Sequence, residues 1–358
     1  MISYLLNKIT YALLTLFGVV TVIFFLFNVL PGDPAQMMLG QNEDTEQLKL
    51  VKQKYGFDKP LSTQYFYYLN DLSPLSFHSN KNGDYTALES GKYTASELFT
   101  IGNTTTVIKF PYLRESFTKQ GKRVTEVLGE TLPNTFVLAV SAILIAILLG
   151  VVLGIVSALC KDQWLDKLIQ VVSTLGMSVP SFFSAILFAW LFGFVLHEYT
   201  NLEMTGSLYE LDDFGEAIHV KWKNLILPAI VLGIRPLAVV IQLMRNSLLE
   251  VFNQDYIRTA RAKGLSEFQI IKKHAVKNAM NPVVTAISGW FASMLAGAVF
   301  VEYIFGWNGL GKEIVNALNT LDLPVIMGAV LVIATLFVMI NIFVDLIYAW
   351  LDPKVKLK

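Results

Sequence analysis

The fold is decided by residues 134–160, which read NTFVLAVSAILIAILLGVVLGIVSALC and contain no charged side chain. A helix needs about 20 apolar residues to cross the hydrocarbon core of a bilayer, which is about 30 Å thick. Backbone N–H and C=O groups in hydrocarbon must find partners inside the protein, and the stretch is too long for the roughly 10-residue strands of a membrane barrel. It therefore predicts a membrane-spanning helix.

Five further stretches are also long and predominantly apolar, namely residues 9–30, 168–196, 225–249, 283–301 and 324–350. The chain is 54% hydrophobic and 16% charged, with a mean hydropathy of +0.52, which is too apolar for an ordinary soluble domain. The first stretch is too long for a cleaved signal peptide, whose apolar core is about 7 to 15 residues, and we expect it to be retained. The sequence therefore predicts an all-α, polytopic membrane protein with six transmembrane helices.

The spans divide the chain into three segments: a first transmembrane helix at 1–30, an extracytoplasmic segment at 31–133, and a five-helix core at 134–358 with a polar loop at 251–282. Within the second segment, residues 43–72 predict an amphipathic helix pair around a turn at 56–60. Residues 79–122 are a polar insert with a strand-like run at 106–110.

Basic residues set the orientation, because lysine and arginine gather in the short cytoplasmic loops of membrane proteins. The connection after the fourth stretch is strongly basic, with Arg258, Arg261, Lys263, Lys272, Lys273 and Lys277. By contrast, the charged residues of the segment 197–224 are mostly acidic, and the segment 302–323 contains Lys312 as its single basic residue. The basic loop is therefore expected in the cytoplasm, and with six spans both termini lie there too.

The 251–282 loop is longer than the link between two neighbouring spans requires. It predicts two polar helices broken at Gly264, a residue that reverses a chain readily because it adopts positive φ. Such a surface fits a docking site for another protein. A basic helix attracted to anionic lipid is the other interpretation.

The residues of this loop carry a resemblance to a known family. Residues 256–266, YIRTARAKGLS, together with His274, Asn278 and Pro282, resemble the coupling loop of ABC importer permeases, and the dipeptide and oligopeptide branch in particular. The wider family begins this motif with Glu-Ala-Ala, whereas residues 258–260 here are Arg-Thr-Ala. The stretches LPGDP at 30–34, YGFDKPL at 55–61, LPNT at 132–135, SVPSF at 178–182 and LDP at 351–353 agree with it as well.

The resemblance implies that the following residues couple the chain to ATPase subunits: Arg258, Thr259, Ala260, Arg261, Ala262, Lys263, Gly264, Leu265, His274, Asn278 and Pro282. It also implies the partners: a second, similar permease subunit, two cytoplasmic ABC ATPases and an extracytoplasmic peptide-binding protein. The chain would sit in the inner membrane as a non-catalytic subunit without a cofactor and would carry di- or oligopeptides. A metal chelate or another small solute remains the alternative cargo.

Residues 306–312, GWNGLGK, superficially match a phosphate-binding loop. Glu313 stands where that loop needs Ser or Thr to hold magnesium, and an apolar helix precedes it instead of a strand. By resemblance, the region is an outer cap between the fifth and sixth spans, with Glu302, Phe305, Trp307, Gly309 and Gly311 as its characteristic residues.

Arg235 lies ten positions into the fourth span, about 15 Å deep at 1.5 Å per residue. A charge at that depth costs about 2.5–3.5 kcal/mol and normally faces the bundle interior or a wet cavity. We therefore expect Arg235 either to line the substrate path and meet a peptide carboxylate, or to pair with helix carbonyls or an acid on a partner subunit.

Other function classes find little support in the sequence. The histidines are His78, His197, His219 and His274, and His197-Glu198 lacks the second histidine of a metalloprotease helix. The formal net charge is zero and Cys160 is the single cysteine, so neither nucleic-acid binding nor a disulfide framework is predicted. A gradient-driven secondary transporter would place acidic residues at mid-membrane depth, and a membrane enzyme would need a catalytic constellation.

Overall fold

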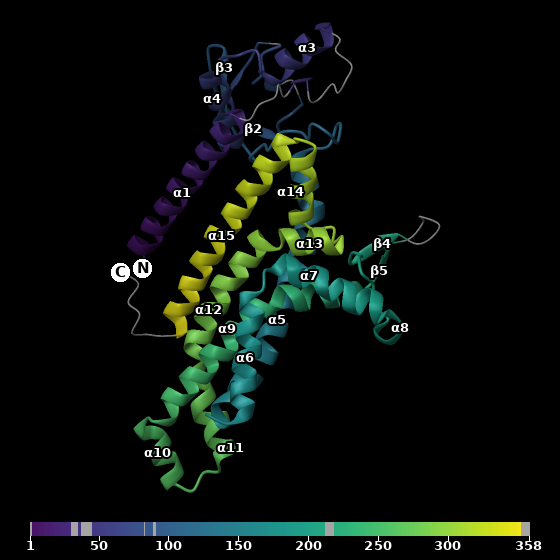
Figure 1. Ribbon diagram of the computed structural model, residues 1–358. Helices are drawn as coiled ribbons and strands as arrows, with labels where there is room; N and C mark the ends of the chain where they lie inside the picture. The colour runs from purple at the N-terminus through teal and green to yellow at the C-terminus, as the bar shows by residue number, and fades with distance from the viewer. Residues whose placement is uncertain are drawn as a thin grey trace. The chain divides into compact units, whose positions relative to one another are not determined.

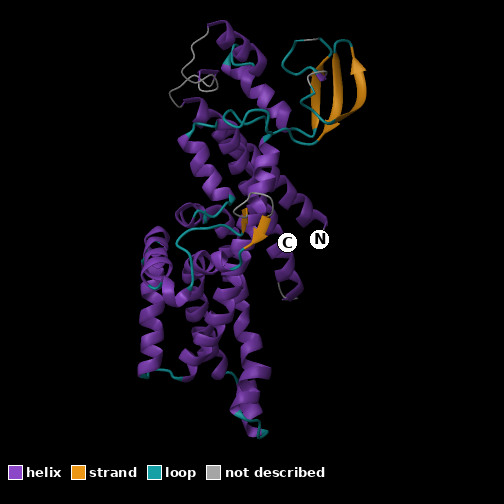
Figure 2. Cartoon of the chain, turned by 90° about the vertical axis from the view of Figure 1, so that its right-hand side faces the viewer, coloured by secondary structure: helices purple, strands orange, loops and turns teal. Residues whose placement is uncertain are grey.

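The structure is a computed structural model that describes residues 2–29, 35–36, 45–81, 83–88, 91–211 and 218–351. Helices dominate this part of the chain (Figure 1). The described strands form one three-stranded and one two-stranded sheet (Figure 2). The helical class predicted from the sequence is thereby confirmed.

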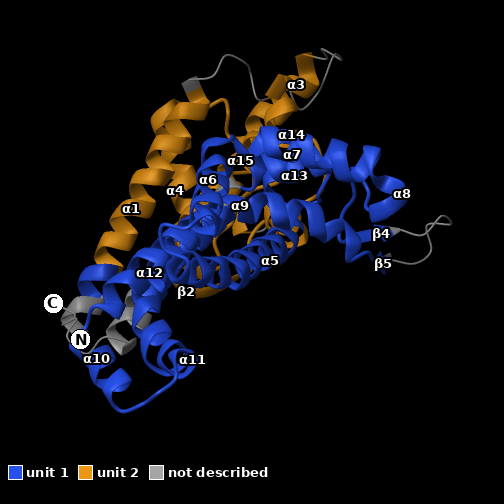
Figure 3. Cartoon of the chain, turned by 60° about the horizontal axis from the view of Figure 1, so that its bottom comes forward, with its two compact units in different colours: residues 1–8, 131–315, 335–358 blue, residues 9–130, 316–334 orange. Residues whose placement is uncertain are grey.

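The chain divides into two compact units (Figure 3). Unit 1 comprises residues 1–8, 131–315 and 335–358, and unit 2 comprises residues 9–130 and 316–334. Four of the described helices, α1 (Ile2–Val29), α5 (Val124–Leu159), α14 (Leu310–Asn319) and α15 (Leu323–Leu351), contribute residues to both units.

Four of the described helices are long and apolar enough to cross a membrane, over Leu6–Asn28, Val124–Leu159, Lys223–Phe252 and Leu323–Val344. Two further spans are bent helix pairs. In one, α6 (Trp164–Ser178) meets α7 (Ser181–Trp190) and a π-helical turn at Leu191–Val195 at an angle of 107°. In the other, the helical run Glu267–Leu295 meets α13 (Val299–Phe305) at 57°. Counting each bent pair as one span gives six, the predicted number.

The third span is the more strongly bent of the two pairs. Residues 168–196 are continuous in hydropathy, but the helix breaks at Val179–Pro180. Proline has no backbone N–H and disfavours helical geometry in the residue before it, and Val179 accordingly has an extended backbone with ψ of 131°. By contrast, Pro228 and Pro236 are accommodated inside one continuous helix, α9 (Lys223–Phe252).

Unit 1 is built on close contact between α5 and α9. A Cβ atom added at Gly150 would lie 2.6 Å from Val240 Cγ1, and one added at Gly154 would lie 2.7 Å from Met244 Cβ. Small residues permit such close approach between helices in lipid, where no hydrophobic force drives association. Gly150 and Gly154 therefore lie where α5 packs closely on α9.

The other elements of unit 1 are α8 (His197–Thr200), β4 (Tyr209–Leu211), β5 (Ile218–Val220), α10 (Asp255–Ala262), α11 (Glu267–Ile270), a π-helical turn at Ile271–Ala275, α12 (Val276–Gly297) and the first part of α14. Strands β4 and β5 pair antiparallel.

Unit 2 contains α1 from Ile9 onward, and α3 (Thr45–Tyr55) and α4 (Leu61–Leu72) follow it. Gly56 reverses the chain between the last two helices with φ of +72°, which confirms the predicted helix pair. Helix α4 packs on α1, where the Tyr65 hydroxyl lies 2.7 Å from Thr21 Oγ1 and the Tyr68 ring stacks on Phe24.

A three-stranded antiparallel sheet of order β1–β3–β2 follows α4 (Figure 2). Its strands are β1 (Leu75–Ser79), β2 (Ala95–Ile101) and β3 (Thr104–Lys109), and the last contains most of the predicted strand-like run. The segments that flank these strands are bound to α4 through Asp71, which is fully buried. The Asp71 carboxylate accepts hydrogen bonds from Tyr85 (2.7 Å), Tyr93 (2.9 Å) and the Arg114 Nε (3.0 Å).

A second buried carboxylate connects the insert to the turn before α15. Asp322 accepts hydrogen bonds from the Ser116 hydroxyl, from the Phe117 backbone N–H at 3.1 Å and from the Thr118 hydroxyl at 2.8 Å. Because both Asp71 and Asp322 are fully paired in the protein interior, the 79–122 insert is an integral part of unit 2.

Candidate functional site

The 251–282 segment forms a basic helix pair at one end of α9 and α12 (Figure 1). Two residues separate the end of α9 from the start of α10. Gly264 adopts φ of +79°, and the Ser266 hydroxyl then accepts a hydrogen bond from the Gln269 backbone N–H in a capping box that starts α11. The predicted break at Gly264 is therefore present, and a local cap fixes the direction of the chain after it.

One side of this helix pair is committed to the protein interior. Ile257, Ala260 and Ile270 are buried in a cluster with Met244 and Leu248 of α9. The Asn278 side chain also donates a hydrogen bond of 2.9 Å to the Tyr256 hydroxyl. The pair is thus packed against α9 and α12 through apolar contacts and cannot swing independently of them.

The other side is charged and exposed. Of the residues singled out from the sequence, Arg258, Thr259, Arg261, Ala262, Lys263, Gly264 and Asn278 are exposed, Leu265, His274 and Pro282 are half-buried, and Ala260 is buried. Arg261 donates to Glu267 at 2.8 Å, and this ion pair raises the pKa of Arg261 and lowers that of Glu267. Pairs this exposed stabilise a fold by only about 0–1 kcal/mol, so these charges remain available to a partner.

Phe268 stands out on this surface because its side chain is 72% exposed beside Lys272 and Lys273. An exposed aromatic residue surrounded by basic ones is typical of the anchors of protein interfaces. No sequence pattern marks Phe268, because the exposure of a side chain cannot be read from composition.

A second feature is the cavity at the break between α6 and α7. Its volume is about 140 Å³, and Arg235 lines it together with Ser181, Ser184, Trp290 and Ser293. Within the described residues, no hydrogen bond or ion pair to Arg235 is found, and its side chain is exposed. A larger apolar groove of about 560 Å³ shares Gly176 and Val179 with this cavity.

The cap loop, residues 302–312, is hydrogen-bonded to α5. The Glu302 carboxylate is fully buried and accepts hydrogen bonds from the Thr135 hydroxyl and the Gly311 N–H, both at 2.6 Å, and from the Lys312 N–H at 3.2 Å. The buried Trp307 donates its indole N–H to the Asn134 carbonyl at 3.0 Å. Glu302 thus occupies the N-terminus of α14, the place where a phosphate-binding loop would hold its anion.

Gly309 and Gly311 belong to the same arrangement. A Cβ atom at Gly309 would lie 2.5 Å from the Glu302 carboxylate, and one at Gly311 would lie 2.5 Å from the Val299 Cα. The five residues predicted for the cap, with Phe305 buried among them, are therefore brought together in one place.

A buried ion pair joins three helices near the basic helix pair, and the sequence analysis missed it. Arg245 of α9 donates to both carboxylate oxygens of Asp166 at the start of α6, at 2.8 and 2.7 Å. The Ser157 hydroxyl of α5 donates to the same carboxylate at 2.5 Å. The Asp166 side chain is 3% exposed and that of Arg245 is 19% exposed.

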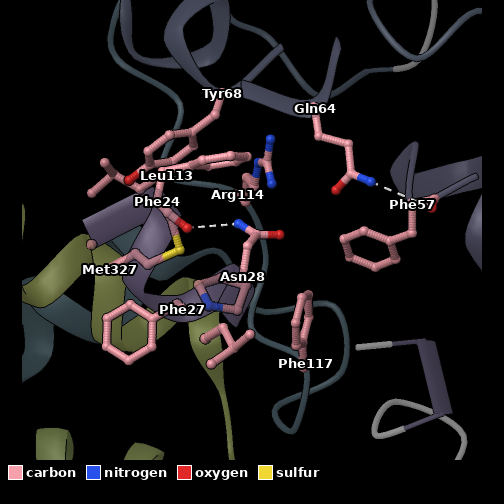
Figure 4. Close-up of a pocket in the computed structure, with 13 residues that line it drawn as sticks. Phe24, Phe27, Asn28, Phe57, Gln64, Tyr68, Leu113, Arg114, Phe117 and Met327 are labelled. Carbon is pink, nitrogen blue, oxygen red and sulfur yellow. Dashed lines mark hydrogen bonds between the residues drawn. The ribbon is translucent and has the colours of Figure 1, made fainter. Parts of the chain in front are cut away.

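A small pocket in unit 2 is a weaker candidate for a functional site. The pocket of Figure 4, in unit 2, is lined by aromatic rings such as Phe27 and Phe117 and by the amides of Asn28 and Gln64. Its volume of about 30 Å³ has room for little more than a water molecule. Among the residues that the structure describes, no cluster of three metal-ligating side chains is found.

These features define a class of protein: a polytopic helical membrane protein whose spans join an exposed basic helix pair. The family model described as "Binding-protein-dependent transport system inner membrane component" matches residues 150–357, and the model of the N-terminal part of such components matches residues 1–81. The chain therefore belongs to this family of permeases of ATP-driven importers and crosses the inner membrane several times. Members of the family work with ATPase subunits and a substrate-binding protein.

Curated relatives match over nearly the whole chain. The dipeptide transport system permease protein of Alkalihalophilus pseudofirmus is 33% identical over 99% of this chain and 100% of its own length. A putative peptide permease protein of Brucella suis is 34% identical over 99% of each chain. The glutathione transport system permease protein of Salmonella typhimurium is 29% identical over 100% of each chain.

Proposed function

We propose that this chain forms the translocation path of a peptide importer together with a second permease subunit, and that two ATPases drive it through the 251–282 segment. The observation that carries the proposal is the two-sided helix pair. Its apolar side is packed on α9 and α12, and its charged side, with Phe268, is exposed. A partner that moves this surface moves both helices with it.

The same observation weighs against the lipid interpretation. A helix that lies on a membrane surface inserts its apolar face between the lipid headgroups. Here Ile257 and Ile270 are fully buried in the protein core, so the exposed aromatic residues Tyr256 and Phe268 stand among charged side chains and form no continuous apolar face. The free side offers Arg258, Arg261 and Lys263, which suit an acidic cleft on a protein.

On this proposal the 251–282 segment and both chain termini lie in the cytoplasm, and the cap loop and the 79–122 insert lie outside. The ATPases hydrolyse ATP and this chain has no catalytic role. Peptide is the cargo that two of the relatives reported above support, since their names specify dipeptide or peptide transport.

Arg235 is the residue proposed to meet the cargo. It lines a cavity at a broken helix, carries a positive charge without an ion-pair partner among the described residues, and has the serines 181, 184 and 293 beside it. Hydroxyl groups and a guanidinium can bind a carboxylate or peptide carbonyls. Bent helices that open a polar cavity within a membrane mark substrate sites in other transporters.

The docking proposal is tested by reversing the charges of the exposed side. We expect the variant Arg261→Glu/Lys263→Glu to insert normally but to lose the ATPases on affinity purification, and Phe268→Ala to weaken their retention. Lys122→Glu is the matched control, because Lys122 is also basic and partly exposed but belongs to unit 2. Full retention of the ATPases by the doubly reversed variant would end the docking proposal.

The path proposal is tested at Arg235. Uptake of a radiolabelled dipeptide should fall sharply in Arg235→Gln, and Arg235→Lys should retain part of it because the positive charge remains. ATPase retention should be the same in both variants. Undiminished uptake by Arg235→Gln would show that Arg235 does not meet the cargo.

A further inference from the structure

The Asp166–Arg245 ion pair lies between the basic helix pair and the broken third span. Arg245 is seven residues before the end of α9, about 10 Å along the helix axis from Phe252. Its neighbours on α9, Met244 and Leu248, belong to the apolar cluster that holds Ile257 and Ile270. A displacement of the basic helix pair therefore reaches Arg245 through packed side chains.

On the other side of the ion pair is α6. Asp166 is near the first residue of this helix, whose last turn, about 20 Å further along, ends at the Val179–Pro180 break. Gly176 and Val179 line the same cavity as Arg235. Helix α6 thus connects the ion pair directly to the wall of the proposed path.

We infer that the Asp166–Arg245 ion pair transmits movement from the α10–α11 pair to α6, so that the broken third span changes its position in step with the ATPases. The inference rests on the proposed docking of ATPases at α10–α11. Asp166 and Arg245 are positioning residues in this scheme, since neither contacts the cavity that Arg235 lines.

The geometry of the contact suits this role. Two parallel N–H···O bonds at 2.8 and 2.7 Å fix the guanidinium and the carboxylate in one plane, so relative rotation of α6 and α9 breaks them. Asp166 is also held by the Ser157 hydroxyl and by the Asp162 N–H at 3.0 Å. At this level α5, α6 and α9 therefore move as one body.

The readout must separate transmission from mere stability. In purified complexes of permeases and ATPases reconstituted in nanodiscs, we would measure the basal rate of ATP hydrolysis and its stimulation by the outer binding protein loaded with a dipeptide. This stimulation requires a signal to cross the permease, whereas ATPase retention and basal hydrolysis do not. In Asp166→Asn the stimulation should fall by about five- to tenfold, a typical range for coupling between sites, with basal hydrolysis unchanged.

Two variants at Arg245 sharpen the test. Arg245→Lys keeps the charge but cannot form the paired bonds, and should give an intermediate stimulation. The exchange Asp166→Arg/Arg245→Asp restores an ion pair of opposite direction and should recover part of the stimulation. Glu130→Gln, which removes one partner of the exposed Lys122–Glu130 pair of unit 2, is the control and should match the unmodified protein.

Wild-type stimulation in both Asp166→Asn and Arg245→Lys would overturn the inference. So would a loss that the charge exchange does not relieve although the exchanged protein assembles with its ATPases. If Asp166→Asn does not accumulate in the membrane, the stimulation of ATP hydrolysis in Arg245→Lys and in the charge exchange tests the inference instead. Failure of the docking proposal would be seen in a different measurement, because the variant Arg261→Glu/Lys263→Glu would then retain the ATPases.

Discussion

Glu302 offers the sharpest test of how the cap loop is held. In Glu302→Gln one carboxylate oxygen becomes an NH₂ group. If that group faces Gly311 and Lys312, the two backbone N–H donors lose their acceptor. If it faces Thr135, the Thr135 hydroxyl loses its acceptor. The second arrangement is the less costly one, and a buried donor without an acceptor costs about 1–3 kcal/mol. We therefore expect Glu302→Gln to lower the free energy of unfolding by that amount.

Glu302→Ala removes the acceptor of all three donors and leaves a cavity, so it should cost about 3 kcal/mol or more. The assay is the thermal unfolding of the purified chain in detergent, followed by tryptophan fluorescence, because Trp307 is fully buried in the cap loop. Glu130→Gln is the control, since the Glu130 side chain is 63% exposed. An Ala variant as stable as this control would refute the assignment of Glu302 as the anchor of the loop.

Three further predictions concern packing and charge. Gly154→Val should destabilise unit 1 by about 1–3 kcal/mol because its side chain meets Met244, whereas Gly129→Ala, with nothing within 4 Å of the added Cβ, should be tolerated; unfolding in detergent compares them. Asp71→Asn leaves Arg114 buried without its carboxylate, so the insert should lose about 3–5 kcal/mol and become sensitive to protease, and unchanged resistance would contradict this. Burial lowers the pKa of Lys109 from its usual 10.5 to about 8. Between these two pH values the unfolded chain binds more protons than the folded chain, so the protease resistance of the insert should rise with pH. Lys109→Met should abolish that rise.

The spans were predictable because hydrocarbon imposes a strict rule on length and polarity. The sequence stretches locate six apolar segments, and the described helices contain or overlap all six. Their ends were less predictable. Helix α5 begins at Val124, ten residues before the apolar stretch, because Glu126 and Glu130 continue the helix beyond the hydrophobic portion. Hydropathy marks the part of a helix that suits lipid, and the helix itself extends further.

The candidate sites were predictable to different degrees. The motif around Gly264 located the basic helix pair and the glycines near Trp307 located the cap loop, because turns and close approaches demand particular residues. The ion pair was missed because Asp166 and Arg245 are 79 positions apart and each lies at the margin of an apolar run. One signal was available: Arg245 is a charge inside the fourth predicted span, and such a charge calls for a named partner.

On the proposed function, the α10–α11 surface binds the ATPases in the cytoplasm. This assignment is tested most directly by placing a single cysteine at the exposed position Lys263, in a chain whose Cys160 is replaced by serine. A membrane-impermeant maleimide would then be added to inside-out and right-side-out vesicles. We predict labelling only in inside-out vesicles, and protection when the ATPases are bound. Labelling of Lys263→Cys in right-side-out vesicles would contradict the account.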